Sequence, residues 1–282
     1  IRDSLTVMLL VLCSAMMHAG WNTIVKTAGD KLTDVALVTG WAALFAALTL
    51  PHFPLPSTAS LPYLAASVVI HCGYFSLVAF AYRAGDLSFA YPVMRGSAPL
   101  FTALISVAAM SELITPWGWM GIVLLSGGIL LLALEHWQPG HTQGHALWIG
   151  LGNACIIVLY TLIDGIGVRL SGDAWSYIAW MFFLNGIGLL GMVIVLRGRQ
   201  VGFALRKNWR NSAAGGALTL GAYGIALWAM TQAAIPLVAA LRETSVVFGL
   251  ILARLTLRES FGIRRWAASG LVAAGAAALK FG

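Results

Sequence analysis

The chain consists almost entirely of apolar runs of about 20 residues, and this succession restricts it to one class of fold. We place ten runs at 4–23, 33–51, 61–82, 87–110, 116–135, 146–168, 174–196, 211–233, 236–254 and 264–281. As a helix, a run of this length crosses the ~30 Å hydrocarbon core of a bilayer. The alternating pattern of outer-membrane strands is absent. The sequence therefore predicts an all-α integral membrane protein with ten transmembrane helices.

Composition supports a membrane location. Of the 282 residues, 60% are hydrophobic and only 10% are charged, whereas soluble domains carry about 25% charged residues. The short connections leave no room for a soluble catalytic or binding domain, and we expect no cleavable signal peptide. All three cysteines fall inside apolar runs, so we expect buried thiols rather than disulfides or a metal site.

Basic residues are distributed unevenly over the connections. Twelve of the 17 lysines and arginines lie in or beside the first, third, seventh and ninth connections, and only three lie on the opposite side. Short cytoplasmic loops carry such an excess of Lys and Arg. The asymmetry predicts a multi-pass protein of the cell inner (plasma) membrane with both termini outside the cytoplasm. It also explains the net charge of +7 without a nucleic-acid partner.

The second half of the chain repeats the first at a shift of 147 residues. The shift aligns three distinctive pairs: Arg95 with Arg242, Glu112 with Glu259, and Trp119 with Trp266. We therefore divide the chain into two five-helix repeats, 1–138 and 139–282. Because five is odd, the second repeat enters the membrane from the opposite side. Such inverted repeats are common in secondary transporters, which bind substrate near the midplane between the halves and work by alternating access.

Two spans carry an arginine near their centre, Arg95 in the fourth and Arg242 in the ninth. A charge at this depth costs at least about 2.5–3.5 kcal/mol on insertion scales, so it is rarely idle. One interpretation is recognition of a substrate carboxylate, whose geometry matches the guanidinium fork. The other, which the repeat favours, is a structural pair or a gate. Glu243 follows Arg242 directly, but adjacent helical residues diverge by about 100° and need not touch.

Polar and aromatic side chains recur at helical spacing in several spans. Lipid satisfies no hydrogen bonds, so these faces are expected to point inward and form the wall of a wet cavity. The predicted cavity residues are His18, Trp21, Asn22, His71, Tyr74, Tyr82, Arg95, Tyr160, Asp164, Trp228 and Arg242. For any single residue a different role is also open. Tyr and Trp also mark interfaces, and a membrane His is often a neutral helix partner. Asp164 either carries a proton, pairs with a cation such as Lys26, or is solvated. Tyr91 and Tyr223 are further candidates for an aromatic-lined pocket.

Three prolines are predicted to kink or gate helices, namely Pro92 and Pro99 in the fourth span and Pro236 in the ninth. A proline inside a helix frees a backbone carbonyl, and a static packing bend is the alternative role. Glu112 and Glu259 close their spans and are predicted to fix a loop or cap a neighbouring helix.

Particular stretches of the sequence carry a family resemblance. SELITPWGWMGIVLLSGG and LRESFGIRRWAASGLVAAG each join a span-closing Glu to a Gly-rich span, and HAGWNTIVK lies in the first span. With these stretches and its two five-span halves, the chain resembles the EamA family of the drug/metabolite transporter superfamily. The resemblance implies export of small metabolites, and the chain is similar to the aromatic amino-acid exporters of that family. Many members are drawn with cytoplasmic termini, unlike the orientation predicted here.

These features predict a secondary transporter of amino acids, including aromatic ones, for which a monomer suffices. No ATP-binding P-loop, HExxH or GxSxG motif occurs, so we expect no direct ATP drive, no enzyme activity, no catalytic residues and no cofactor. The expected partners are a small-molecule substrate and the lipid bilayer. A phosphorylated-sugar or nucleotide-sugar antiporter is the main alternative. A channel and a membrane enzyme are further alternatives.

Overall fold

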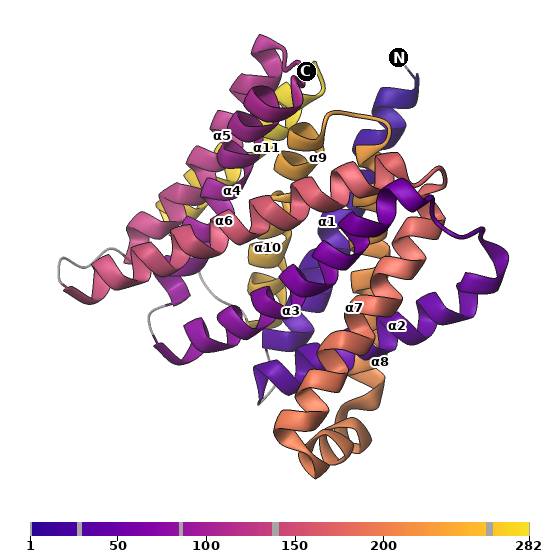
Figure 1. The fold of residues 1–282 in the computed structure, drawn as a ribbon. Helices are drawn as coiled ribbons and strands as arrows, with labels where there is room; N and C mark the ends of the chain where they lie inside the picture. The colour runs from indigo at the N-terminus through magenta and orange to yellow at the C-terminus, as the bar shows by residue number, and fades with distance from the viewer. Residues whose placement is uncertain (1, 27–29, 85–86, 137–140, 258–261, 282) are drawn as a thin grey trace.

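The computed structural model is all-helical in the part of the chain that it describes. This part comprises residues 2–26, 30–84, 87–136, 141–257 and 262–281, without the side chains at 2–4, 26, 75–84, 87–88, 136, 141–143 and 255–257. It contains eleven α-helices and three short 3-10 helices, and no strand. The all-α prediction is confirmed. In Figure 1 the helices cross one another in a bundle, and the chain begins and ends at the same end of it.

The helix boundaries follow the predicted spans within a few residues, with two exceptions. The helices are α1 (Arg2–Lys26), α2 (Lys31–Thr49), α3 (Leu61–Ala84), α4 (Leu87–Met110), α5 (Pro116–Ala133), α6 (His141–Leu170), α7 (Ala174–Arg197), α8 (Arg199–Met230), α9 (Ile235–Arg242), α10 (Ser245–Leu257) and α11 (Ile263–Leu279). Short 3-10 helices lie at Leu50–His52, Thr58–Ser60 and Leu134–His136. Within the described residues, eight stretches are long and apolar enough to cross a membrane, and one of them joins α9 to α10.

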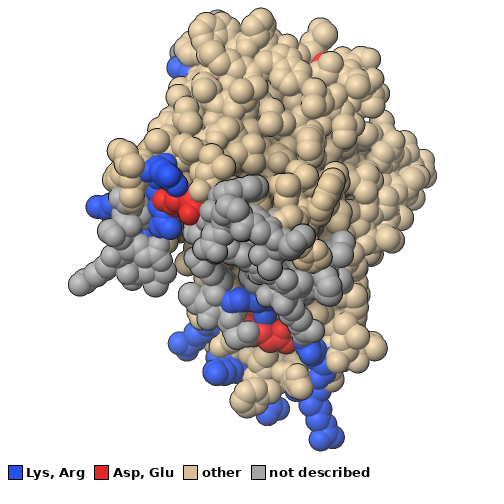
Figure 2. Space-filling model, turned by 90° about the vertical axis from the view of Figure 1, so that its left-hand side faces the viewer, with Lys and Arg blue, Asp and Glu red and all other residues tan. Residues whose placement is uncertain are grey.

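The first exception is α8, which begins at Arg199 instead of residue 211. Its 32 residues correspond to about 48 Å of helix, well beyond the ~30 Å apolar core. The extra turns carry the basic stretch that the sequence suggested was a connection. On the face of the molecule that Figure 2 shows, most of the Lys and Arg lie in the lower part, and the upper part is nearly all uncharged.

The second exception is the ninth span, which is divided at Glu243 and Thr244 into α9 and α10. At this junction backbone hydrogen bonds join residues three apart, as in a 3-10 helix, and not four apart. They run from Thr244 N to Leu241 O (3.2 Å) and from Val246 N to Glu243 O (3.0 Å). The Thr244 hydroxyl also donates to the Leu241 carbonyl at 2.7 Å, which competes with regular helical bonding. A 3-10 segment inside a helix often marks a functional hinge.

The two halves pack through exchanged partners. Helix α1 packs against α8 as α6 packs against α3, and α2 packs against α8 as α7 packs against α3. In the same way α1 contacts α10 while α6 contacts α4, and α2·α7 and α5·α11 are pairs of corresponding helices. This is the pattern that a pseudo-two-fold axis between the predicted repeats would produce. The division into two repeats and their inverted insertion in a membrane remain predictions.

Glycines permit close backbone approach where α5 crosses α11. A Cβ atom on Gly275 would lie 2.7 Å from the Leu125 backbone nitrogen and 2.8 Å from the Gly121 carbonyl oxygen. Small residues at such crossings let membrane helices pack closely. Neither backbone atom can move aside without displacing its helix.

We therefore expect Gly275→Val to destabilise the bundle by at least about 1–3 kcal/mol, the usual range for overpacking. The measurement is the melting temperature and the size-exclusion profile of the detergent-purified protein. Gly270→Val is the matched control, because a Cβ at Gly270 on the same helix meets nothing within 4 Å. Equal stability of the two variants would contradict the close crossing.

Candidate functional site

A cavity of about 100 Å³ lies between the two halves of the chain, near the middle of several helices. Eight of the predicted cavity residues line it: His18, Trp21, Asn22, His71, Tyr74, Arg95, Tyr160 and Arg242. Small-molecule sites usually measure about 300–1,000 Å³. The cavity is therefore contracted, and a metabolite of ordinary size requires it to widen.

The other predicted residues lie elsewhere. Asp164 is fully buried behind the cavity wall, and Trp228 packs against the core without lining the cavity. The Tyr82 side chain lies outside the described residues. Whether a polar side chain reaches the cavity depends on how its helix is rotated about its axis.

The prolines have two different placements. Pro92 and Pro99 lie inside α4, where the sequence placed them. Pro236 lies in the first turn of α9, where a missing N–H interrupts no helical hydrogen bond. At this position Pro236 frees no carbonyl inside α9, and the discontinuity of the ninth span lies after Arg242; a kinking or gating role for the three prolines remains a prediction.

Several cavity residues were missing from the predicted set. They are Thr39, Met94, Met181, Phe182, Asn185, Gly186 and Thr219, while the further pocket candidates Tyr91 and Tyr223 do line the cavity. Most belong to α2, α7 and α8, whose sequences have no clear polar stripe. Asn185, as an isolated amide in an apolar span, was the one signal in α7 that could have been used. Its Oδ1 atom is buried and has no hydrogen-bond partner among the described residues.

Arg95 forms a buried ion pair with Glu243. Its Nε lies 2.7 Å from Glu243 Oε2, with side chains only 4% and 6% exposed. This is an ion pair by distance, although neither atom makes a well-aligned hydrogen bond. Arg95 also donates through Nη2 to Ser245 Oγ at 2.9 Å. These contacts tie α4 of the first half to the α9–α10 junction of the second.

Arg242 is buried without such a partner. It lines the cavity with 6% of its surface exposed, and its Nε has no hydrogen-bond partner among the described residues. None of the ion pairs among the described residues includes Arg242. Its guanidinium carbon lies 4.8 Å from the centre of the Tyr223 ring, a cation–π contact. The cavity wall thus presents a cation that no carboxylate of the described chain neutralises by direct contact.

Aromatic rings form the remaining wall around this cation. Tyr160 is their centre, with ring distances of 4.8 Å to His71, 5.6 Å to Tyr74 and 6.0 Å to Tyr223. Tyr160 meets Tyr74 and Tyr223 edge to face and His71 at a tilt, and all three pairs lie in the favourable range of ring separation. The arrangement offers ring faces to an apolar or cationic part of a ligand next to the guanidinium.

One end of the cavity is sealed by apolar side chains. Along α8, Leu227 and Met230 follow the cavity residue Tyr223, and Val168 and Ile235 lie nearby at the ends of α6 and α9. All four sealing side chains are at most 2% exposed. The described state is therefore closed at this end.

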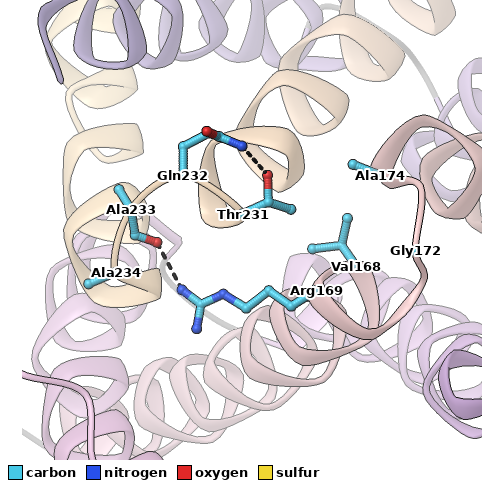
Figure 3. A pocket seen from close by; sticks show the side chains of 8 residues that line it. All are labelled: Val168, Arg169, Gly172, Ala174, Thr231, Gln232, Ala233 and Ala234. Carbon is cyan, nitrogen blue, oxygen red and sulfur yellow. Dashed lines mark hydrogen bonds between the residues drawn. The ribbon is translucent and has the colours of Figure 1, made fainter. Parts of the chain in front are cut away.

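Polar contacts around Arg169 and Glu112, which we call the polar latch, lie beside these four apolar side chains. Arg169 at the end of α6 donates to the carbonyls of Met230 (2.7 Å) and Ala233 (2.8 Å) and pairs with Glu112. Glu112 in turn accepts from the backbone N–H of Ile235 at 3.0 Å, the start of α9. Figure 3 shows Arg169 reaching Ala233 across the wide outer hollow beside this turn. The capping role predicted for Glu112 is thus present, whereas Glu259 lies outside the described residues.

We expect Arg169→Gln to loosen this closed end, because the α8–α9 turn loses its charged partner. The measurement is the rate at which a membrane-impermeant maleimide labels a Leu227→Cys reporter in proteoliposomes, in a protein whose three native cysteines are replaced by alanine. Labelling should be faster with Arg169→Gln than with the reporter alone. Arg210→Gln on the exposed part of α8 is the control and should leave the rate unchanged. Equal rates in all three proteins would rule out a closing role for the latch.

Comparison with known proteins relates the second half of the chain to a transporter family. Residues 145–280 match the EamA-like transporter family. This half is similar to EamA-like transporters. The match confirms the EamA resemblance there and agrees with the expectation of a transporter rather than an enzyme. Within the described residues, no group of three or more His, Cys, Asp or Glu side chains is placed to hold a metal ion.

Two further comparisons extend beyond this half. An uncharacterized transporter of Synechocystis sp. is 26% identical to this chain over 194 residues, which cover 62% of this chain and 57% of that protein. The chain thus spans little more than half the length of this curated relative. A solved crystal structure superposes with a TM-score of 0.74 over 98% of this chain and 96% of its own, at 15% identity. At that identity the likeness shows a shared fold alone.

Proposed function

We propose that this chain is a secondary transporter of small carboxylate-bearing metabolites, with amino acids, including aromatic ones, as the leading class. The observation that carries the proposal is Arg242, a buried guanidinium in the cavity with no anionic partner among the described residues. A buried charge is normally paired, since an isolated one is costly. A substrate carboxylate is the partner that the guanidinium fork fits best.

The neighbouring side chains support a zwitterion with an apolar side chain. The tyrosine faces around Arg242 suit an aromatic or aliphatic group, and an ammonium group is attracted to ring faces. The unpartnered Asn185 Oδ1 is a further acceptor for the ammonium. In this proposal the carboxylate binds Arg242 and the ammonium is held by neutral acceptors and rings.

We propose that the α9–α10 junction is the hinge for alternating access. It carries both Arg242 and Glu243, so a substrate that binds Arg242 acts directly on the segment that Arg95 ties to the other half. We propose that binding shifts the balance between the described state, closed at the Glu112–Arg169 end, and one open there. The orientation suggested by the loop charges, with the termini outside the cytoplasm, belongs to the same proposal.

A phosphorylated-sugar antiporter is the second candidate, because it also needs cavity arginines. The charge of Arg95 is already balanced by Glu243, which leaves one unpaired guanidinium in the described cavity. A phosphate group carries about −1.5 to −2 charges at neutral pH and fits this single cation less well than a carboxylate does.

The test is counterflow in liposomes that contain purified protein and one unlabelled substrate inside. Labelled Phe, Trp, Met, Thr, Lys and a nucleotide-sugar are offered outside, without ATP, and protein-free liposomes provide the background. Saturable exchange of an amino acid supports the proposal. Exchange of the nucleotide-sugar alone, accelerated by its mononucleotide inside, would replace it with the second candidate.

A further inference from the structure

Asp164 in α6 is a fully buried carboxylate that the cavity wall hides from the substrate site. Tyr223 donates to one of its oxygens at 2.7 Å, and Tyr177 donates to the other at 3.3 Å. No lysine or arginine among the described residues forms an ion pair with it. An ionised carboxylate held mainly by neutral hydroxyls in an apolar interior is costly, and taking up a proton removes that cost.

The groups around Asp164 come from every helix packed on this part of α6. Ser67 and His71 face it from α3, Tyr177 from α7 and Tyr223 from α8. The charged groups on the other neighbouring helices are Arg95 on α4 and Arg242 and Glu243 at the end of α9. Of these, His71 also lines the cavity. A proton that arrives in the cavity therefore has an imidazole placed between it and the carboxylate.

Tyr223 connects this carboxylate to the substrate site. Its hydroxyl bonds Asp164 while its ring face contacts the Arg242 guanidinium at 4.8 Å. The charge of Asp164 is thus one side chain away from the cation proposed to bind substrate. An ionised Asp164 and a substrate carboxylate would both draw on the positive charge of Arg242, so each weakens the hold of the other.

We propose that Asp164 is the site of a coupling proton that binds together with the substrate. One proton adds to one carboxylate oxygen, the charge changes from −1 to 0, and no other bond is made or broken. Neutral Asp164 leaves the full charge of Arg242 to the substrate, and by reciprocity bound substrate favours the proton. The inference rests on the proposed function, because it assumes that Arg242 binds a carboxylate.

The proton site itself is tested without substrate, by infrared difference spectra of purified protein between alkaline and acidic buffer. We expect a carbonyl band of a buried carboxylic acid in the wild type that is absent in Asp164→Asn. Asp30→Asn, an exposed carboxylate at the start of α2, is the matched control and should retain the band. An identical band in the wild type and Asp164→Asn would overturn the proposal.

The linkage is tested by the binding of labelled phenylalanine as a function of pH. Wild-type affinity should fall as pH rises, by up to about tenfold per pH unit, the limit for one linked proton. Asparagine imitates the protonated carboxyl, so Asp164→Asn should bind at every pH with the affinity that the wild type has in acid. Tyr223→Phe, which removes a hydroxyl that donates to ionised Asp164, should shift the pH dependence to higher pH. If Asp164→Asn keeps the wild-type pH dependence while His71→Gln loses it, the proton belongs to His71 and the proposal is wrong.

The two proposals fail in different ways. Absence of phenylalanine binding and counterflow would count against the proposed substrate, while the infrared experiment still decides whether Asp164 takes up the proton. Counterflow with a flat pH dependence in the wild type would preserve the transporter and remove the coupling.

Discussion

Replacing Arg242 with glutamine should weaken phenylalanine binding by at least about 30-fold and leave the protein at least as stable as the wild type. Losing one member of a buried charge pair costs about 2–5 kcal/mol of binding, and about 1.4 kcal/mol corresponds to tenfold. Stability should not fall, because Arg242 forms no ion pair with the described residues in the substrate-free state and its Nε is unbonded there. Removing an unpaired buried charge relieves a desolvation cost. The measurements are the dissociation constant and the melting temperature.

The ligand provides a second perturbation of the same contact. Phenylalaninamide keeps the ring and the ammonium but lacks the carboxylate, so it should compete poorly for the wild type. In Arg242→Gln the two ligands should bind about equally, since the group that distinguishes them is gone. Arg210→Gln, a charge removal on the exposed part of α8, is the control for net charge. Full preference for phenylalanine in Arg242→Gln would show that another residue holds the carboxylate.

Replacing Glu243 with glutamine should have the opposite effect on stability. It leaves Arg95 buried without a counter-ion, and breaking a buried pair in this way costs about 3–5 kcal/mol. Because Arg95 joins α4 to the α9–α10 junction, the loss should also loosen the contact between the halves. The measurement is the melting temperature in detergent, with the rate of irreversible unfolding as a second readout.

A paired variant separates the ion pair from other effects of this substitution. When both charges are replaced by apolar residues of similar volume, as in Arg95→Met with Glu243→Met, much of the stability should return. The interaction free energy from the resulting double-mutant cycle measures the coupling between the two side chains. Additive losses in the two single variants would mean that the pair contributes nothing as a pair.

The helices of this chain were predictable from the sequence, because a backbone in lipid has to satisfy its own hydrogen bonds. Apolar runs of about 20 residues then have few alternatives to a helix. The runs at 87–110 and 174–196 coincide with α4 and α7 almost residue for residue. The start of α8 was missed because its first turns are basic and polar, and helical structure outside the apolar core leaves no hydropathy signal. The division of the ninth span falls on the polar residues 242–245, which the sequence analysis kept inside one span because apolar runs flank them on both sides.

Much of the candidate site was also predictable, because polar side chains in apolar spans have to face inward. His18, Tyr160 and Arg242 were placed in the cavity on that basis alone, and they line it. Helical spacing also grouped Asp164 with Tyr160, but it did not show that Asp164 lies one layer deeper. Depth depends on how α3, α7 and α8 pack on α6, which no local pattern records.

The sequence by itself determined the positions of the membrane helices and of the buried charges, since both follow from the solvent that a bilayer provides. Only the tertiary structure decided which charges are paired. Glu243 is the chain neighbour of Arg242, yet it binds Arg95, 148 residues away, because successive side chains leave a helix in different directions. The crossing of α4 with the α9–α10 junction thus neutralises one arginine and leaves the other available to the cavity.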